Sequence, residues 1–395
     1  MIFNECVLKD LTIDGRGYYG IGASAVPYDT NRFTYLRITD INDDGTLNYS
    51  GLMSVDDKDA DKYLLQPNDI VFARTGASTG RNYLYDGEIA NMVYAGFLIK
   101  YSLDSEKVNP KYVKYYCLSK TYRDWVKSVM TGSTRGNVNE KQFGNMPIMV
   151  PERHIQDKIV ILLDSLTNKI KLNNEINNNL YELAIKYLKE MQSDDEIALS
   201  TFGKIQGGYA FKSKDLLDTK TNNRIIKIKN LRNEISADVV NSQFVEDEVI
   251  EKLDNKFKIQ RGNVAIAMTG AELGKTGFIY GFDNYYLNQR VGLVRGITRE
   301  KELYLNILLL SQEFQDLLNS KGYGSAQPNV STTDIENILI PNIGDENLVK
   351  FYEIFSTIYA KIILNCEENL NLEQLRDTLL PKLMNGEIDL DNIEI

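Results

Sequence analysis

Residues 169–180 read KIKLNNEINNNL, and residues 361–372 read KIILNCEENLNL. When the two segments are aligned without gaps, at an offset of 192, eight of the twelve positions are identical. A segment that returns at a fixed distance indicates an internal duplication, and this one returns about half of the 395-residue chain later. The chain is therefore predicted to be one structural unit written twice.

Three further pairs of segments support the duplication, because they occur in the same order in both halves. The offset between partners drifts by only a few residues, which chance alignment of unrelated segments does not produce. The pairs are residues 68–77 with 80–81 against 262–271 with 274–275, residues 132–138 against 324–330, and residues 35–41 against 225–231.

Apolar residues around the first repeated segment recur at alternating spacings of three and four, as in the seam of a coiled coil. Both repeats have asparagine at two central seam positions, namely Asn173 and Asn177 in the first repeat and Asn365 and Asn369 in the second. A polar residue there typically fixes the register at some cost in stability. A helix over 155–191 would be about 55 Å long, which is too long to be covered by one globule. We therefore predict that the two long helices pack on each other, in antiparallel directions.

Each repeat places a mixed region before its helix. Short β-rich runs lie between Gly, Asn and Asp turn signals, and helical stretches over 110–130 and 301–319 are interspersed with them. The β-rich runs are residues 70–73, 96–101, 264–268 and 291–295. This pattern predicts the α+β class.

The composition argues against several classes of enzyme. The chain carries 45 Lys+Arg, 55 Asp+Glu and a net charge of −10. Its single histidine, His154, excludes HExxH and multi-histidine metal sites, and a Ser-His-Asp triad would have to use that residue. The three separated cysteines fit a reducing cytosol. No apolar run approaches the ~18 residues that cross a bilayer. We expect a cytoplasmic protein that has no catalytic residue, metal or cofactor and does not contact a membrane.

One motif resembles a phosphate-binding loop and does not fit it. In residues 270–276, GAELGKT, three residues separate the glycines, whereas a P-loop has four. The loop should also open a helix, but residues 277–281 have the pattern of a strand.

The distribution of charge is more informative than its sum. Residues 201–300 contain sixteen Lys/Arg and twelve Asp/Glu, whereas residues 351–395 contain three and nine. Basic residues and some of the 24 tyrosines also interleave, as in Lys111-Tyr112 and Tyr122-Arg123. Such patches suit contacts with phosphates and bases.

The ordered set of motifs resembles the specificity subunit of type I restriction–modification systems over essentially the whole chain. Its marks are the duplication, the turn at residues 74–81 with its partner at 269–275, and residues 288–291 (NQRV). Further marks are residues 324–330 (GSAQPNV) and the closing 379–388 (LLPKLMNGEI). One departure is that Pro341, unlike Pro151, is not followed by the glutamine that enters the first long helix.

The resemblance implies a non-catalytic reader of DNA with two pseudo-twofold-related globular target recognition domains, joined by two long antiparallel coiled-coil helices. It assigns residues 1–152 and 197–344 to the recognition domains, 153–196 to a central spacer helix and 345–395 to a C-terminal spacer helix. Each domain would read one half of a bipartite, asymmetric target in double-stranded DNA. The helices would dock two modification (methyltransferase) subunits, and ATP-driven translocation and cleavage would belong to restriction subunits.

The duplication sorts the candidate DNA-binding residues. Two domains that read different half-sites cannot discriminate through residues that they share, so shared residues are predicted to shape turns or to contact phosphate. Residues that differ are the candidates for base readout: Arg74 against Met268, Arg135 against Gln327, and Tyr94 against Arg290. The remaining predicted DNA contacts are Arg81, Ser133, Asn137, Lys275, Ser325 and Asn329.

Apolar helix residues beyond the seam are the candidates for binding partner subunits. They are Leu172, Ile176, Ile363 and Leu375. Two other interpretations stay open from the sequence. One is a self-contained DNA methyltransferase or nuclease with an internal duplication, and the other is a coiled-coil adaptor that does not bind DNA.

Overall fold

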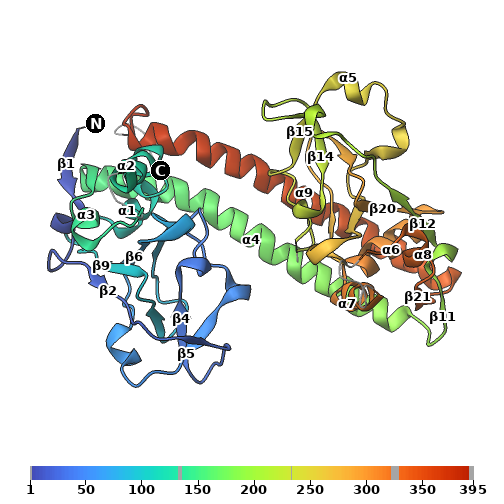
Figure 1. Cartoon of the computed structure of the whole chain (residues 1–395), viewed down its shortest axis with the longest axis horizontal. Helices are drawn as coiled ribbons and strands as arrows, with labels where there is room; N and C mark the ends of the chain where they lie inside the picture. Colours follow the sequence, from blue (N-terminus) through green and yellow to red (C-terminus); the bar gives the residue numbers. More distant parts are fainter. Residues whose placement is uncertain (1, 132–135, 233, 322–328, 391–395) are drawn as a thin grey trace. The chain divides into compact units, whose positions relative to one another are not determined.

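The structure is a computed structural model that describes residues 2–131, 136–232, 234–321 and 329–390. The chain forms two compact units. The first unit comprises residues 1–167 and 374–395, and the second comprises residues 168–373. Each unit contains a globule of strands and short helices, together with a segment of each long helix (Figure 1).

In the first unit, two four-stranded sheets and a two-stranded sheet carry the short helices. The strand orders are β2-β9-β6-β7, β3-β5-β4-β8 and β1-β10. The strands are β1 (Phe3–Val7), β2 (Tyr18–Tyr19), β3 (Ala25–Val26), β4 (Phe33–Leu36), β5 (Met53–Val55), β6 (Asp69–Ala73), β7 (Asn82–Leu84), β8 (Met92–Tyr94), β9 (Leu98–Ser102) and β10 (Pro147–Pro151). The short α-helices are α1 (Pro110–Tyr116), α2 (Lys120–Thr131) and α3 (Glu140–Gly144).

The second unit repeats this arrangement, with a fifth strand in one of its sheets. Its strand orders are β12-β20-β17-β18, β13-β15-β14-β19-β16 and β11-β21. The strands are β11 (Glu196–Ala198), β12 (Gly203–Gly207), β13 (Leu216–Leu217), β14 (Asn223–Ile226), β15 (Gln243–Val245), β16 (Lys258–Ile259), β17 (Val264–Ala267), β18 (Thr276–Phe278), β19 (Asn284–Leu287), β20 (Val291–Gly296) and β21 (Leu339–Pro341). The short α-helices are α5 (Asp247–Ile250), α6 (Arg299–Leu310), α7 (Gln312–Lys321) and α8 (Thr332–Glu336).

The predicted duplication is confirmed by the sheet topology. The pair β4–β8 is parallel and its counterpart β14–β19 is also parallel, whereas the other paired strands in both units are antiparallel. The central strands β6 and β17 are buried along their whole length. Their continuous apolar sequences, DIVFA and VAIA, suit strands with both faces covered.

The two helical stretches predicted over 110–130 and 301–319 are each broken into two helices. Helix α1 ends before Ser119, and the Ser119 hydroxyl accepts a hydrogen bond from the backbone N–H of Tyr122 at 3.2 Å. In the second unit, Ser311 has an extended backbone (φ −69°, ψ 145°) and caps Phe314 N–H at 3.3 Å. Because a serine cap satisfies a free N–H at a helix start, it can end one helix and begin the next within an apolar run.

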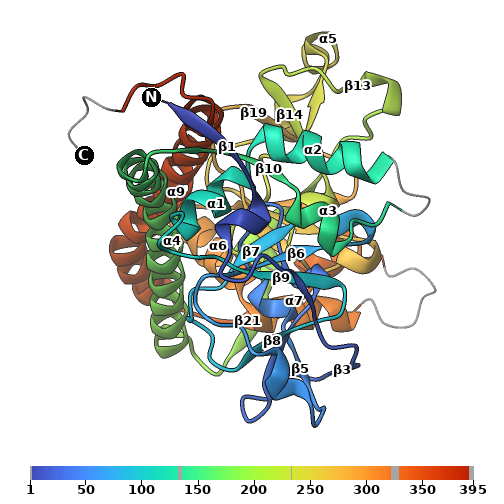
Figure 2. The ribbon, with the colours of Figure 1, turned by 90° about the vertical axis from the view of Figure 1, so that its left-hand side faces the viewer.

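The long helices α4 (Arg153–Met191) and α9 (Asp345–Met384) are continuous over 39 and 40 residues. Figures 1 and 2 show them side by side. In the second unit, Asn173 Nδ2 donates to Asn369 Oδ1 at 2.9 Å, and Asn365 Nδ2 donates to Asn177 Oδ1 at 2.8 Å. The helices therefore run antiparallel, as predicted, because an advance along α4 corresponds to a step back along α9.

Candidate nucleic-acid interface

A tight turn between the central strand β6 and the edge strand β7 carries the predicted DNA-binding residues Arg74 and Arg81. The chain leaves β6 at Ala73 and returns at Gly80, whose N–H donates to the Ala73 carbonyl at 2.8 Å. Gly76 (φ 72°) and Gly80 (φ 91°) have positive φ, which favours glycine. The second unit repeats the bond between Gly274 and Ala267 at 3.0 Å. These observations support the assignment of the shared glycines to turn geometry.

The loop before α3 is tied to this turn. Thr75 Oγ1 donates to Asn137 Oδ1 at 2.6 Å, and Val138 N–H donates to the Arg74 carbonyl at 3.0 Å. In the second unit, Val330 N–H donates to the Met268 carbonyl at 3.0 Å. The structure thus brings Asn137 beside the turn although about sixty residues separate them in the sequence. Asn329 forms an isolated antiparallel β-bridge with Thr269 and is exposed.

Arg74 lies on an aromatic ring at the surface. Its guanidinium carbon is 5.0 Å from the centroid of the Tyr19 ring, and its Nε is buried without a hydrogen-bond partner among the described residues. The backbone N–H of Arg74 donates to the backbone carbonyl of Phe97 at 3.0 Å, and Phe97 is 59% exposed. Tyr19 and Phe97 were not found from the sequence. The only available signal was their place beside the repeated turn.

The sequence alignment of Tyr94 with Arg290 is wrong by three residues. Tyr94 lies on β8, is 3% exposed and packs in the core, so its side chain cannot reach a base. In the register of the parallel pairs, Tyr94 faces Leu36, and Leu287 occupies the same place opposite Ile226. The exposed Arg290 corresponds instead to Phe97. The Arg290 carbonyl accepts from the backbone N–H of Met268 at 3.1 Å, just as the Phe97 carbonyl accepts from that of Arg74.

The two other cations of the turns are engaged by carboxylates. Arg81 Nε contacts Asp43 Oδ1 at 2.7 Å, and one of its terminal nitrogens donates to the Ile41 carbonyl at 3.1 Å. Lys275 forms an ion pair with Glu272. Each charge is partly neutralised, which makes these two residues weaker candidates for phosphate contact than Arg74. The predicted contacts Ser133, Arg135, Ser325 and Gln327 lie outside the described residues.

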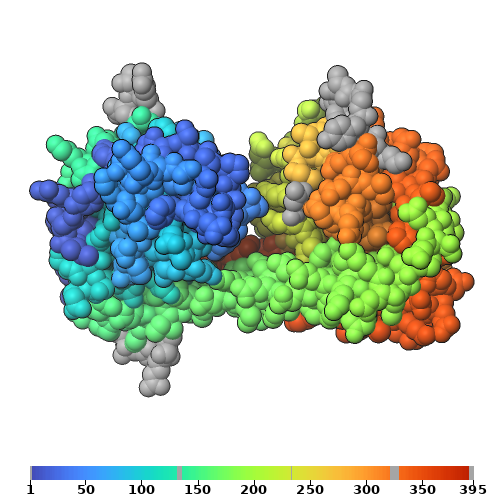
Figure 3. All heavy atoms as spheres, turned by 90° about the horizontal axis from the view of Figure 1, so that it is seen from below, coloured from blue at the N-terminus to red at the C-terminus, as the bar shows by residue number. Residues whose placement is uncertain are grey.

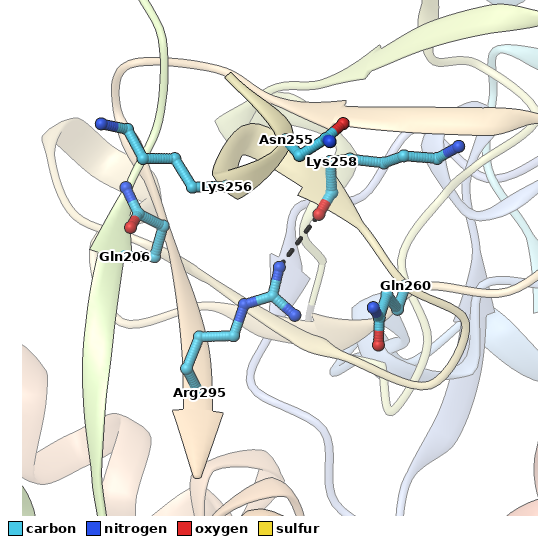
Figure 4. Close-up of a pocket in the computed structure, with 6 residues that line it drawn as sticks. All are labelled: Gln206, Asn255, Lys256, Lys258, Gln260 and Arg295. Carbon is cyan, nitrogen blue, oxygen red and sulfur yellow. Dashed lines mark hydrogen bonds between the residues drawn. The ribbon is translucent and has the colours of Figure 1, made fainter. Parts of the chain in front are cut away.

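A basic pocket of about 650 Å³ lies in the second unit and was not predicted. Figure 4 shows Arg295 at its centre, with the ammonium ends of Lys256 and Lys258 pointing away from it. Arg295 donates to the Lys258 carbonyl at 2.9 Å and to Asn263 Oδ1 at 3.0 Å, and burial lowers the pKa of its guanidinium. The remaining lining residues are Gln206, Asn255 and Gln260. No carboxylate lines the pocket, although Lys256 pairs with Asp254 at 3.5 Å.

Two of the three cations of this pocket have uncharged counterparts in the first unit. The strand registers place Ser102 where Arg295 lies, and Leu64 where Lys258 lies. The basic pocket is therefore a feature of the second repeat, and the sequence comparison missed it because these positions lie outside the conserved-looking segments.

The predicted partner-binding residues on the long helices divide into exposed and buried sets. Leu172 is exposed, as is its counterpart in the repeat, Leu364, and Leu375 is exposed as well. Ile176 is half-buried. Ile363 is 4% exposed and packs in the core of the second unit, so its assignment to a partner surface is wrong. The space-filling view in Figure 3 shows side chains of α4 at the surface of the second unit.

The described residues carry few features of the other protein classes. Within the described ranges, no group of three or more His, Cys, Asp or Glu residues could hold a metal ion. Cys117 and Cys366 are buried, and burial raises the pKa of both thiols. None of the described helices is long and apolar enough to cross a membrane.

Comparison with known families gives the repeat a name. The profile of the type I restriction modification DNA specificity domain matches twice, at residues 25–182 and 199–374. The chain belongs to the type I restriction–modification specificity family. Members of this family are recognition subunits rather than the catalytic components of their complexes.

Similar proteins cover most of this specificity protein. The MjaIX specificity subunit of Methanocaldococcus jannaschii is 22% identical over 318 residues, which cover 74% of this chain and 72% of the relative. The HindI specificity subunit of Haemophilus influenzae is 20% identical over 406 residues, which cover 83% and 88%. The crystal structure of the type I S subunit from M. genitalium aligns with a TM-score of 0.56 at 16% identity, covering 96% of both chains. This last likeness confirms the fold of the specificity protein.

Proposed function

We propose that this specificity subunit reads a bipartite, asymmetric DNA target, with one half-site for each globule. One observation carries the proposal: both globules build the same backbone turn and place different side chains on it. Arg74 of the first globule occupies the backbone position of Met268 in the second, and Phe97 occupies the position of Arg290. A shared frame with different side chains is what two readers of different sequences need, because bases are distinguished by the groups that reach their edges.

The domain boundaries of this proposal follow the long helices. Residues 1–152 and 197–344 act as the first and second target recognition domains. Residues 153–196 and 345–395 contain α4 and α9 and act as the central and C-terminal spacer helices. The C-terminal helical segment is strongly acidic, with three Lys/Arg and nine Asp/Glu in residues 351–395, so contact with DNA falls to the globules.

The long helices also provide the proposed docking surfaces for two modification subunits. Leu172 and Leu364 hold equivalent places in the two repeats and are 50% and 52% exposed. Leucines exposed to this extent on a helix suit a protein–protein interface. Because the surface occurs twice, we infer two modification subunits, one for each repeat. Restriction subunits would join that complex, which would act in the cytoplasm.

Exchange of one globule tests the proposal. Residues 197–341 would be replaced by the corresponding region of a specificity subunit with a different target. The chimera would be assembled with its modification subunits, and methylated sites would be mapped. One half of the methylated motif should change and the other should stay. The reciprocal control replaces residues 1–152 and should change only the other half. A change in both halves after either exchange would show that the globules do not read independently.

A further inference from the structure

The two globules place an arginine at different members of the same pair of positions. In the first globule, the pair is Arg74 and Phe97, joined by a backbone hydrogen bond of 3.0 Å. In the second globule, it is Met268 and Arg290, joined by the equivalent bond of 3.1 Å. The arginine and the apolar side chain have thus changed places on a conserved backbone frame.

The arginine of the first globule is held in place but not neutralised. Stacking on Tyr19 restricts the guanidinium, while its Nε has no partner among the described residues. The structure gives Arg74 no ion pair with a described carboxylate, in contrast to Arg81 on the same turn. A positioned arginine with unused donors needs an acceptor, and the exposed Phe97 beside it marks this surface as a place where a ligand can lie.

The arginine of the second globule is exposed at the neighbouring position. Arg290 has no hydrogen bond or ion pair through its side chain with any residue that the structure describes. Met268, at the position of Arg74, is 7% exposed and packs in the core. Only one member of the pair can therefore offer hydrogen bonds in each globule.

We propose that this pair of positions decides where each half-site carries a recognised guanine. Arg74 and Arg290 each bind the O6 and N7 of one guanine in the major groove, which is the commonest specific contact of arginine with DNA. This assignment rests on the proposed function. Paired residues of neighbouring strands lie about 5 Å apart, and base pairs are stacked at about 3.4 Å. If the two globules are superposed, the guanine bound by Arg290 therefore lies about one to two base pairs away from the guanine bound by Arg74.

Replacing guanines by 7-deazaguanine tests the assignment, because the analogue lacks the N7 acceptor. The specificity subunit in complex with its modification subunits would be titrated with target duplexes in which one guanine at a time is replaced. One position in each half-site should weaken binding roughly 5- to 150-fold. Arg74→Met should abolish the sensitivity in one half-site only, and Arg290→Met in the other only. Arg153→Met, at an exposed position in the first turn of α4, is the matched control and should leave both sensitivities intact.

Two results separate this inference from the proposed function. If Arg74→Met weakens binding evenly to target and scrambled duplexes, and the sensitivity to 7-deazaguanine persists, Arg74 contacts phosphate and the inference is overturned while the bipartite reader stands. If wild-type complex binds target and scrambled duplexes equally, the proposed function itself fails. Arg74→Lys guards against a folding effect, because it keeps the charge without the two-pronged donor. It should retain affinity for scrambled DNA within about twofold and lose the discrimination at guanine.

Discussion

Replacing the buried asparagines between the long helices should show strong coupling between two residues that are far apart in the sequence. In the second unit, Asn365 Nδ2 donates to Asn177 Oδ1 at 2.8 Å, and both side chains are almost fully buried. Asn177 Nδ2 also donates to the Ile362 carbonyl at 3.2 Å and to Cys366 Sγ at 3.3 Å. The Asn365 Oδ1 has no partner among the described residues. The hydrogen bonds that each amide makes therefore reach the opposite helix.

The size of the effect follows from the polar groups that a substitution strands. Asn365→Leu leaves Asn177 Oδ1 buried without its donor, and Asn177→Leu leaves Asn365 Nδ2 without its acceptor. A stranded buried polar group costs about 1–3 kcal/mol. For a unit of about 200 residues, that cost lowers the melting temperature by about 2–12 °C. The double replacement removes both amides, and it should unfold near or above the wild-type temperature because leucine resembles asparagine in shape and prefers an apolar seam.

A double-mutant cycle measured by scanning calorimetry checks this reasoning. The unfolding transition of the second unit would be followed in wild type, both single variants and the double variant. The exposed Asn178 supplies the control, because Asn178→Leu should change the free energy of unfolding by no more than about 0.5 kcal/mol. If the two single effects simply add in the double variant, the amides do not depend on each other and the reasoning is refuted.

Three further predictions concern binding surfaces and thiols. Lys258→Ala should reduce by about one unit the slope of the logarithm of DNA affinity against the logarithm of salt concentration. Replacement of the exposed Lys252 by alanine is the control and should leave that slope unchanged. Equal slopes for the Lys258 variant and wild type would show that the pocket does not contact DNA. Leu172→Asp should lower the number of bound modification subunits from two to one in native mass spectrometry while DNA affinity is kept, and two bound subunits at saturation would contradict it. Cys6, which is partly exposed, should react with a thiol reagent at pH 8 well before Cys366, because burial raises the pKa of the Cys366 thiol to about 12 and the thiolate is the reactive form. Equal rates in the folded protein would be evidence against the buried seam.

Much of the architecture could be predicted from the sequence, because its signals are local or repeated. The segment 169–180 and its copy revealed the duplication, and the recurring asparagines predicted a polar seam between the two long helices. Turn glycines such as Gly76 could also be found, because a backbone position with positive φ favours glycine. These features depend on few residues at a time, and a repeat displays them twice.

The side chains that face a ligand depended on register, which local patterns do not fix. The sequence comparison matched Tyr94 with Arg290, whereas the structure matches Phe97 with Arg290. The three residues between them lead from the buried strand that holds Tyr94 to the surface turn that holds Phe97. Ile363 lies beyond the predicted seam of its helix, yet its side chain packs against Gly262 and is 4% exposed in the folded unit. The sequence by itself determined the repeat, its helices and its turns, because those follow from spacing along the chain. Only the tertiary structure decided which side of each element meets solvent, because burial is set by partners that are distant in sequence and arrive together only when the chain folds.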